Sequence, residues 1–446
     1  MMRSPAFAGK RYAVLGLARS GLATVEMLLA SGAHVTAWDA REEPRHLLQS
    51  RVELADPLSI DLAGFDGVVV SPGVPLNRHP IAEAAASVGV PIIGDIELFA
   101  QARDALPAHR VVAITGTNGK STTTALVHHL LKSAGLAARM GGNIGLPILG
   151  QEPLPEGGIY VLELSSYQID LTYSLECEVA ALLNITPDHL DRYNSFAAYA
   201  ASKARLFAMQ RVDQHAVFGV GDAETVTIAH AEARRRPSEF VHRVDGSDIA
   251  SLQPDWPSLQ GPHNLQNAAV AVAIVEALGL SPSQWQPALR TFRGLPHRME
   301  RVGEADGVIF INDSKATNPA SAAPALAAFP PRPGKRIHWI VGGLPKGDNL
   351  RECEPWFGNV AAAYTIGDAG HMFAELLEPY MPVTRSELMS QAIRQAIEAA
   401  HPGDIVMLSP ACASFDQFRD YEARGDAFRQ IVEALTTPHE ANGGAK

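Results

Sequence analysis

The chain has 446 residues, which at roughly 150 residues per domain suggests about three domains. Hydrophobic residues make up 46% and charged residues 19%, and these values exclude an intrinsically disordered or collagen-like chain. The formal net charge of −11 argues against non-specific binding to nucleic acid or anionic lipid. Because its three cysteines fit neither a disulfide framework nor a zinc site and no apolar run is long enough to span a membrane, we expect a cytoplasmic protein.

The first 98 residues alternate short apolar runs with helical patterns, which is the rhythm of a βαβ unit. We expect a helix over residues 21–30 and strands over residues 12–17, 34–38, 67–70 and 90–93. The turn from Gly16 to Gly21 is similar to a dinucleotide-binding fingerprint, although Ala18 replaces its middle glycine, and Asp39 stands where a ribose-binding acid belongs. An NAD-linked oxidoreductase and a protein that binds a UDP-sugar are therefore both open.

Residues 99–294 predict a second α/β unit that carries a phosphate-binding loop. We expect a helix over residues 264–278 and strands over residues 111–114, 159–164, 179–185 and 216–220. A glycine-rich turn follows the first of these strands, so that backbone N–H groups can cradle phosphates while Lys120 neutralises them and Ser121 ligates Mg²⁺. The turn is two residues shorter than the usual P-loop, because Ile114 stands where the first glycine belongs.

Further side chains are expected at the same edge of this sheet. Glu163 ends one buried strand and His189 follows another, and the carboxyl ends of parallel strands face the ligand crevice. Together with a hydroxyl group they make a plausible Mg²⁺ site. Lys203 lies in an amphipathic helical pattern, and periodicity alone predicts that this lysine is exposed to solvent.

Residues 295–446 repeat the rhythm and predict a third parallel sheet. We expect its strands over residues 308–311, 337–341, 362–366 and 405–408. Polar turns at 312–318, 342–346 and 409–414 follow three of these strands. Each turn alone is typical of a helix cap, but three of them at one sheet edge favour a carboxylate or phosphate ligand.

Seven segments together resemble a known family. Residues 115–122 resemble the short phosphate-binding loop of the Mur ligases and the folylpolyglutamate synthetases. The other six resemble the glutamate-adding type of Mur ligase, at residues 94–98, 141–145, 162–168, 295–298, 312–318 and 408–414. The resemblance runs through essentially the whole chain.

The resemblance implies an α/β protein of three domains, each built on a largely parallel sheet with flanking helices. Its Rossmann-like N-terminal domain (1–98) would bind a UDP-sugar, its central P-loop domain (99–294) ATP, and its Rossmann-like C-terminal domain (295–446) an amino acid. The implied reaction adds D-glutamate to UDP-N-acetylmuramoyl-L-alanine through an acyl phosphate, in peptidoglycan precursor synthesis. The implied cofactors are ATP and Mg²⁺ at two sites, and we expect a monomer that has no nucleic-acid or membrane partner.

The resemblance also implies roles for individual residues. Positions of the UDP-substrate site are Arg19, Ser20, Asp39, Ser71, Gly73, Asn143 and His189. Positions of the ATP site are Gly116, Thr117, Asn118, Gly119, Lys120, Ser121, Thr122, Asn264, Asn267, His297, Arg298 and Asp313. Implied Mg²⁺ ligands are Ser121, Glu163, His189 and Lys203, the last as a carbamate formed with CO₂. Glutamate-site positions are Thr317, Lys346, Ser414 and Tyr421, where Tyr421 replaces a common Phe. The implied catalytic set is Lys120, Glu163, His189, Lys203 and Arg298.

Three alternatives stay open beside this reaction. One is a sister ligase that adds L-glutamate, because the choice of stereoisomer depends on placing Lys346, Ser414 and Tyr421 to within about half an ångström. Another is a regulatory module that binds ATP without chemistry. The third is the NAD-linked oxidoreductase, against which Ala18 argues.

Overall fold

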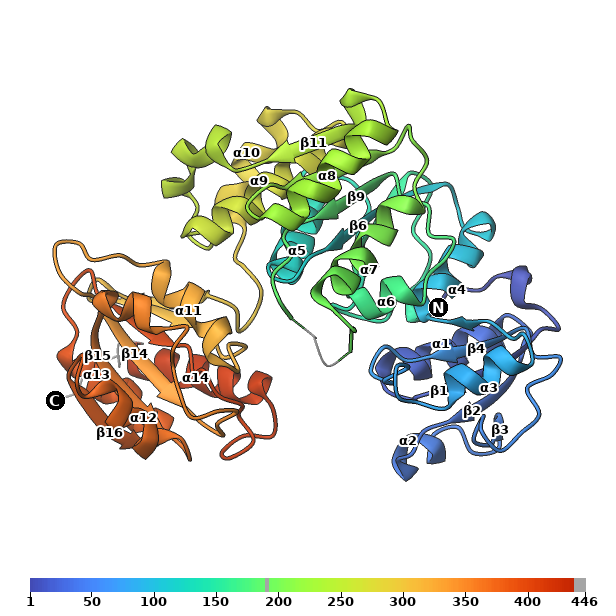
Figure 1. Cartoon of the computed structure of the whole chain (residues 1–446). Coiled ribbons are helices and arrows are strands. Elements are labelled where there is room, and N and C mark those ends of the chain that lie inside the picture. The colour runs from blue at the N-terminus through green and yellow to red at the C-terminus, as the bar shows by residue number, and fades with distance from the viewer. Residues whose placement is uncertain (189–191, 437–446) are drawn as a thin grey trace, which may run out of the picture. The chain divides into compact units, whose positions relative to one another are not determined.

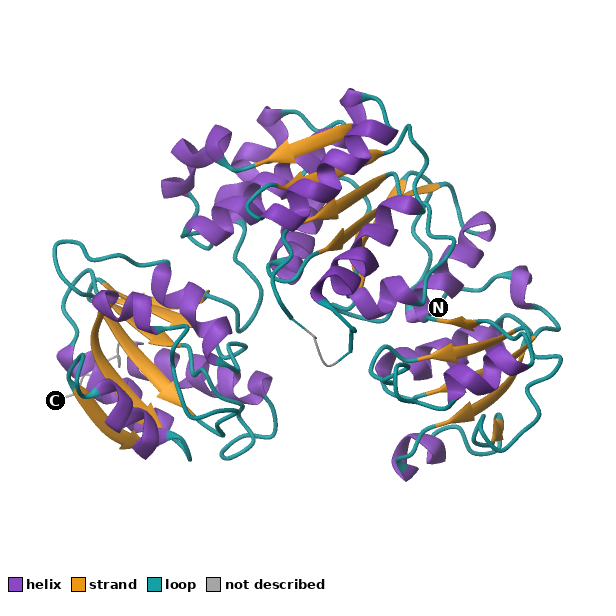
Figure 2. Cartoon of the chain, viewed as in Figure 1, coloured by secondary structure: helices purple, strands orange, loops and turns teal. Residues whose placement is uncertain are grey.

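The computed structural model describes residues 1–188 and 192–436, in which strands and helices alternate around three separate sheets (Figure 1, Figure 2). Residues 1–248 and 266–289 form one compact unit, which contains the first two sheets. Residues 249–265 and those from 290 onward form a second unit, which contains the third sheet. The predicted α/β fold with three largely parallel sheets is confirmed, whereas the domain boundaries after residues 98 and 294 stay predictions. None of the helices described is long and apolar enough to cross a membrane.

The first sheet has five parallel strands in the order β3-β2-β1-β4-β5. Its strands are β1 (Arg11–Leu15), β2 (His34–Trp38), β3 (Glu53–Leu54), β4 (Gly67–Val70) and β5 (Ile92–Ile93). Its helices are α1 (Arg19–Ala30), α2 (Glu42–His46), α3 (Ile81–Ser87) and α4 (Asp95–Ala102). From β1 the strands follow one another to one edge of the sheet, through β2 to β3, and from β4 to the other edge at β5. The strand order therefore reverses between β1 and β4, and the turns after these two strands border the crevice where such sheets bind ligands.

The second sheet has six parallel strands in the order β11-β10-β9-β6-β8-β7. Its strands are β6 (His109–Thr115), β7 (Ala138–Gly142), β8 (Gly158–Glu163), β9 (Val179–Leu182), β10 (His215–Gly219) and β11 (Val241–Val244). The helices in this part of the chain are α5 (Lys120–Ser133), α6 (Ser166–Asp170), α7 (Phe196–Ala208), α8 (Ala223–Arg235), α9 (Pro262–Ala277) and α10 (Pro282–Thr291). The central strand β6 is buried over its last five residues, as expected for a strand covered on both faces.

The third sheet has six strands in the order β12-β13-β17-β14-β15-β16. Its strands are β12 (Glu300–Ala305), β13 (Val308–Asn312), β14 (Ile337–Gly342), β15 (Val360–Ile366), β16 (Val383–Glu387) and β17 (Ile405–Leu408). Its helices are α11 (Pro319–Ala327), α12 (Gly370–Leu377), α13 (Met389–Ala399) and α14 (Tyr421–Thr436). One strand departs from the parallel pattern of this largely parallel sheet, because β12, which the sequence did not predict, pairs antiparallel with β13. The cause is the tight turn at Asp306 and Gly307, where both residues have positive φ, the requirement of a hairpin turn.

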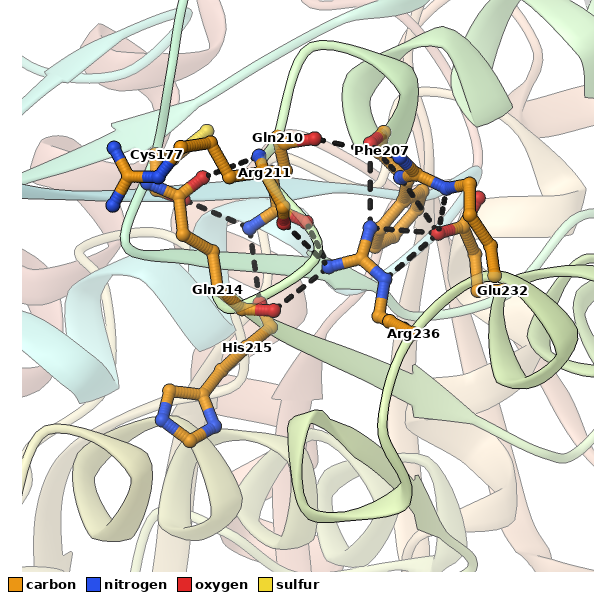
Figure 3. A network of polar contacts seen from close by, with 9 residues as sticks. Cys177, Phe207, Gln210, Arg211, Gln214, His215, Glu232 and Arg236 are labelled. Carbon is orange, nitrogen blue, oxygen red and sulfur yellow. Dashed lines mark hydrogen bonds and ion pairs between the residues drawn. The ribbon is translucent and has the colours of Figure 1, made fainter.

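A buried guanidinium anchors one end of the second sheet (Figure 3). Arg236, which follows α8, pairs with Glu232 at 2.6 Å and donates to the carbonyl oxygen of Gln214 at 2.7 Å. It also donates to Gln210 Oε1 at 3.3 Å, and Gln210 Nε2 in turn donates to backbone carbonyls near the starts of β9 and β10. Since a buried charge needs such partners to offset its desolvation, this network fixes the end of α7, the helix that carries Lys203.

Candidate active site

The loop between β6 and α5 contains two glycines whose backbone conformation and close neighbours disfavour any side chain. Gly119 has φ +82°, and a Cβ atom there would lie 2.2 Å from Asn267 Oδ1. Gly116 has φ +154°, and a Cβ atom there would lie 3.0 Å from the Cβ of Leu183. The two glycines therefore allow the backbone to close tightly, and they place Asn267 of α9 against the loop.

The loop is held in place by the turn that follows β9. Thr117 N and Asn118 N donate to the backbone and side-chain oxygens of Asn184, each at 2.9 Å. Lys120 folds back over the loop, and its Nζ donates to the carbonyl oxygens of Gly116 at 3.0 Å and Thr117 at 2.9 Å. The positive end of the α5 dipole and this ammonium group suit the loop to bind phosphate.

Glu163 lies beside the start of this loop. It is paired with Ile114 across β8 and β6, and its side chain is only 2% exposed. Oε1 accepts a hydrogen bond from Asn143 Nδ2 at 3.1 Å, whereas the buried Oε2 has no hydrogen-bond partner in the described part of the chain. Ser121 occupies the first turn of α5. A buried carboxylate oxygen without a donor suits a hard cation, so these residues fit Mg²⁺.

Lys203 is buried, with only 1% of its surface exposed, so the expectation of a solvent-exposed lysine is wrong. Its Nζ donates to Gly116 O at 2.9 Å and lies 4.7 Å from the centre of the Tyr199 ring. Burial, and then the charge of Lys120, lower the pKa of Lys203 to about 7. CO₂ reacts with the neutral form of an amine, and the lowered pKa increases the fraction of Lys203 in that form. The site therefore permits the expected carbamate. The expected ligand His189 lies outside the described residues.

In the first sheet, Asp39 stabilises the turn that resembles a dinucleotide fingerprint. Its Oδ2 accepts from Leu17 N at 2.7 Å and its Oδ1 from Arg41 N at 2.9 Å. Although burial opposes the effect, these N–H groups and the Arg41 guanidinium hold the pKa of Asp39 below its usual value. Ser71, in the turn after β4, donates to Gly16 O at 2.9 Å. The two turns at the crevice are thus joined directly.

Arg192 is a residue near this crevice that sequence reasoning did not identify. Its guanidinium donates to the carbonyl oxygens of Gly73 and Val74, both at 3.1 Å, and lies 4.6 Å from the centre of the Tyr167 ring. A cavity of about 180 Å³ adjoins these groups, lined by Pro72, Val74, Leu76, Asn77, Tyr167, Asp170, Leu171, Arg192 and Tyr193. Arg19, the first residue of α1, donates to Gly145 O at 3.0 Å.

In the second unit, Asp313 is a buried carboxyl group at the carboxyl end of β13. It is 6% exposed, and it accepts from Ser409 Oγ at 2.7 Å and from Met299 N at 3.1 Å. Burial raises the pKa of Asp313 to about 7, while the two hydrogen bonds and the charge of Arg298 act in the opposite direction. The neighbouring His297 has φ +62°, and its carbonyl oxygen accepts from Lys315 N at 2.9 Å.

Three polar turns of the third sheet meet as expected. Lys346 Nζ donates to Thr317 Oγ1 at 3.2 Å, which joins two of the expected glutamate-site residues. The buried Arg424 was not identified from the sequence; its guanidinium donates to Ser314 Oγ at 2.9 Å, Ser314 O at 2.8 Å and Ala413 O at 3.1 Å. Ser314 Oγ in turn donates to Tyr421 O at 2.9 Å. This arginine therefore links the turns that carry Thr317, Ser414 and Tyr421.

The expected site residues fall in both compact units. Arg19, Ser20, Asp39, Ser71, Gly73, Asn143, Glu163, Lys203, Asn267 and the residues of the 116–122 loop belong to the first unit. Asn264, His297, Arg298, Asp313, Thr317, Lys346, Ser414 and Tyr421 belong to the second. Among residues 1–188 and 192–436, no three His, Cys, Asp or Glu side chains form a metal site, so a cation at Glu163 needs hydroxyl, lysine-derived or substrate oxygens as well.

The doubly wound first sheet, the compact phosphate-binding loop and the polar edge of the third sheet define a nucleotide-binding α/β protein of three domains. Residues 10–94 match the family model of the Mur ligase MurD-like N-terminal domain, residues 114–275 the Mur ligase middle domain and residues 297–412 the Mur ligase glutamate ligase domain. The chain belongs to the Mur ligase family.

Two curated relatives extend over nearly the whole chain. The UDP-N-acetylmuramoylalanine–D-glutamate ligase of Novosphingobium aromaticivorans is 71% identical over 441 residues, which cover 99% of this chain and 98% of the relative. The ligase of the same name from Sphingopyxis alaskensis is 61% identical and covers 98% of this chain and 100% of the relative. Among solved structures, the MurF ligase of Thermotoga maritima in complex with ADP has a TM-score of 0.56 at 14% identity, covering 97% of both chains. This last likeness supports the fold alone.

Proposed function

We infer that the chain is an ATP-dependent ligase that joins D-glutamate to UDP-N-acetylmuramoyl-L-alanine in peptidoglycan synthesis. The observation that carries this inference is the convergence of Lys120 and Lys203 on Gly116 O, beside the buried Glu163, in a chain whose relatives bear the name of that ligase. The ammonium group of Lys120, a helix N-terminus and a carboxylate suit a triphosphate with its cation. The oxidoreductase alternative has no support in these relatives.

The chemistry must convert a carboxylate into an electrophile. A carboxylate oxygen of the alanyl group attacks the γ-phosphorus of ATP, so that ADP leaves and an acyl phosphate forms. The amine of glutamate then attacks the acyl carbon and loses a proton, and phosphate departs with the oxygen that came from the carboxylate. Both steps shift negative charge onto phosphoryl oxygens, which preorganised cations stabilise.

The residues of the first unit would bind the phosphates and the cations. Lys120 and the loop amides neutralise and orient the triphosphate. We propose that Ser121 and Glu163 hold one Mg²⁺, and that Glu163, His189 and carbamylated Lys203 hold a second. When bound, Mg²⁺ neutralises charge on the transferring phosphoryl group. The residues around Asp39, Ser71 and Gly73 would hold the UDP end of the substrate, together with Arg19, Ser20 and Asn143.

The residues of the second unit would bind the amino acid and the nucleoside. Thr317 and Lys346, which lie in hydrogen-bond contact, supply a hydroxyl and an ammonium group for a carboxylate of glutamate. Ser414 and Tyr421 would complete this site. We propose that Asn264, His297, Arg298 and Asp313, with Asn267 of the first unit, bind the nucleotide.

An assay of ADP and phosphate release tests the proposed function. The purified chain is incubated with ATP, Mg²⁺ and UDP-N-acetylmuramoyl-L-alanine, and D-glutamate, L-glutamate or D-aspartate is added. We expect release only when both substrates are present and fastest with D-glutamate. Release that needs no amino acid would contradict a ligase, and a preference for L-glutamate would assign the sister reaction. We also propose that the chain acts as a monomer, and a stable dimer in light scattering would contradict this.

A further inference from the structure

The proposed reaction leaves one motif of the sequence without a role, the segment from Gly94 to Leu98. Asp95 begins α4 and is 4% exposed. Its Oδ1 accepts a hydrogen bond from Ile96 N at 3.0 Å. Its Oδ2 is buried and makes no hydrogen bond within the described residues, although the Gln168 side chain lies close enough to lower the pKa of this carboxyl group. Because a buried carboxylate oxygen without a donor is costly, its presence calls for a function.

Asp95 lines a small cavity beneath the two turns of the crevice. The cavity has a volume of about 10 Å³, roughly the room that one water molecule needs. Three of its lining residues carry hydroxyl groups, Ser20, Thr24 and Ser71. The complete lining is Val14, Ser20, Gly21, Thr24, Val69, Val70, Ser71, Pro72 and Asp95. Asp95 is thus the charged group that lines this cavity, and hydroxyls of α1 and of the turn after β4 line it as well.

The two turns above the cavity have no room to shift independently. Ser71 Oγ donates to Gly16 O at 2.9 Å. A Cβ atom on Gly21 would lie 1.9 Å from the same oxygen and 3.3 Å from Ser71 Oγ. A displacement of Ser71 therefore moves the turn after β1 as well, and both turns belong to the proposed site for the UDP end of the substrate.

The helix that carries Asp95 is anchored to the segment that follows β8. Gly94 N donates to Leu171 O at 2.9 Å. Two turn amides, Tyr173 N and Ser174 N, donate to Glu97 Oε2 at 2.7 and 2.9 Å. The position of the Asp95 carboxylate is therefore set by the segment that begins just after Glu163.

The free energy of folding gives no reason to keep a charge at this position. Burial raises the pKa of Asp95 to about 6, although Ile96 N–H and the Gln168 side chain favour the charged form. No charged side chain other than Asp95 lines the cavity from α1, β1, β4 or the turn after β4. Since the folded pKa lies above the unfolded value, ionised Asp95 weakens the fold at neutral pH. A group that is kept at such a cost is a candidate for a functional role.

We propose that Asp95 is a positioning residue for the nucleotide substrate, whose buried carboxylate fixes the Ser20 and Ser71 turns in the orientation that binds the UDP end. The inference rests on the proposed UDP site. The carboxylate does not touch the substrate. It would act on the hydroxyls of the cavity through the one water molecule for which the cavity has room, and through the anchored helix α4.

Asp95→Asn tests the proposal, because the amide keeps the size of the side chain and removes its charge. We expect the KM for UDP-N-acetylmuramoyl-L-alanine to rise about tenfold, the size of one charge-assisted hydrogen bond, which the carboxylate would make to a water molecule in the cavity. The KM values for ATP and D-glutamate should stay within about twofold, and the Tm at pH 8 should equal or exceed that of the wild type. An unchanged KM for the nucleotide, or a lower Tm with all three KM values raised alike, would overturn the proposal.

Glu97→Gln is the matched control, since Glu97 is a buried carboxylate of the same helix that does not line the cavity. It should lower the Tm without a selective rise in the KM for the nucleotide, and a selective rise would overturn the role given to the cavity. Thr24→Val removes one cavity hydroxyl and serves if Asp95→Asn does not fold. It should raise the same KM about threefold, an effect near the lower end for one hydrogen bond, and an unchanged KM would overturn the proposal.

A double-mutant cycle tests the path through the cavity. If Asp95 acts through Ser71, the double variant with Asp95→Asn and Ser71→Ala should have a KM for the nucleotide no higher than that of the more impaired single variant. Additive effects would overturn this path. If the wild-type chain forms no amide bond, the proposed function is contradicted. If the wild type is active but Asp95→Asn leaves the KM for the nucleotide unchanged, only the positioning role is contradicted.

Discussion

Lys120 and Lys203 share one backbone acceptor, because the Nζ atoms of both side chains donate to Gly116 O, at 3.0 and 2.9 Å. The two amines come from α5 and α7 and meet under the phosphate-binding loop. The burial of Lys203, and then its proximity to Lys120, disfavour a positive charge on this amine, and the pKa of Lys203 falls to about 7. A carbamate on Lys203 would replace this repulsion with an attraction and supply oxygen ligands for Mg²⁺.

Substitution of Lys203 tests the carbamate. Lys203→Ala should lower kcat by about a thousandfold, since a ligand of the proposed second Mg²⁺ is lost, and short carboxylic acids should restore part of the activity. In the wild type, ¹³C-labelled bicarbonate should give a carbamate signal in NMR spectra that Lys203→Ala lacks. Activity that does not respond to the substitution would discredit the carbamate.

Lys120 should be needed for turnover. Lys120→Ala removes the ammonium group from the loop, and we expect kcat/KM for ATP to fall by about a hundredfold or more. Lys132→Ala is the matched control, because Lys132 is an exposed lysine in the last turn of the same helix. Steady-state kinetics with both variants checks this prediction, and near-normal rates for Lys120→Ala would remove this lysine from the site.

The unpartnered oxygen of Glu163 predicts a specific effect on the metal requirement. Glu163→Gln keeps the size and can keep the contact with Asn143, but it removes the charge that we assign to Mg²⁺. The Mg²⁺ concentration needed for half-maximal activity should rise about tenfold or more. An activity titration with Mg²⁺ measures this shift. An unchanged Mg²⁺ requirement with full activity would place the cation elsewhere.

Asp313 should make the fold less stable as the pH rises, so its substitution should stabilise the protein at high pH only. Burial raises the pKa of Asp313 to about 7 in the fold, well above the usual 3.8 of an aspartate, so the folded protein keeps a proton there that the unfolded chain loses between about pH 4 and pH 7. This group therefore lowers the stability as pH rises through that window, by roughly 2 to 4 kcal/mol in total. Asp313→Asn should raise the Tm at pH 8 but not at pH 4, while activity falls. Equal effects on Tm at both pH values would contradict this account.

The contact between Lys346 and Thr317 predicts which substrate depends on it. Lys346→Ala should raise the KM for D-glutamate about tenfold or more, because a charge-assisted hydrogen bond to a carboxylate is lost. The KM for UDP-N-acetylmuramoyl-L-alanine should change little. Lys335→Ala, which changes an exposed lysine of the same unit, serves as the control. A rise in the nucleotide KM instead would reassign these residues.

The sequence predicted the elements whose signal is local. The strands over residues 34–38, 67–70 and 405–408 are confirmed with the expected bounds, because each is a short apolar run that is mostly buried. Strand β7 was not expected, since it lies at the edge of its sheet and its residues, Ala138–Gly142, include an arginine and two glycines. The pairing of β12 was missed although Asp306 and Gly307 gave a recognisable hairpin signal.

Properties that depend on tertiary packing were less accessible. Periodicity placed Lys203 on the surface, but the loop from another strand covers its amine, which no helical pattern reports. Arg424 and Arg192 escaped notice because an isolated arginine carries no sign of which carbonyl oxygens it will meet. Asp39 had the spacing of a ribose-binding acid, and the structure adds that its oxygens hold the Leu17 turn.

The fate of one oxygen atom tests the central claim most directly. UDP-N-acetylmuramoyl-L-alanine is labelled with ¹⁸O in its alanyl carboxylate, and the phosphate released during ligation with D-glutamate is analysed by mass spectrometry. An acyl phosphate predicts that each phosphate carries one oxygen from the labelled carboxylate. Unlabelled phosphate together with amide product would show that the acid is not activated by phosphoryl transfer and would contradict the account.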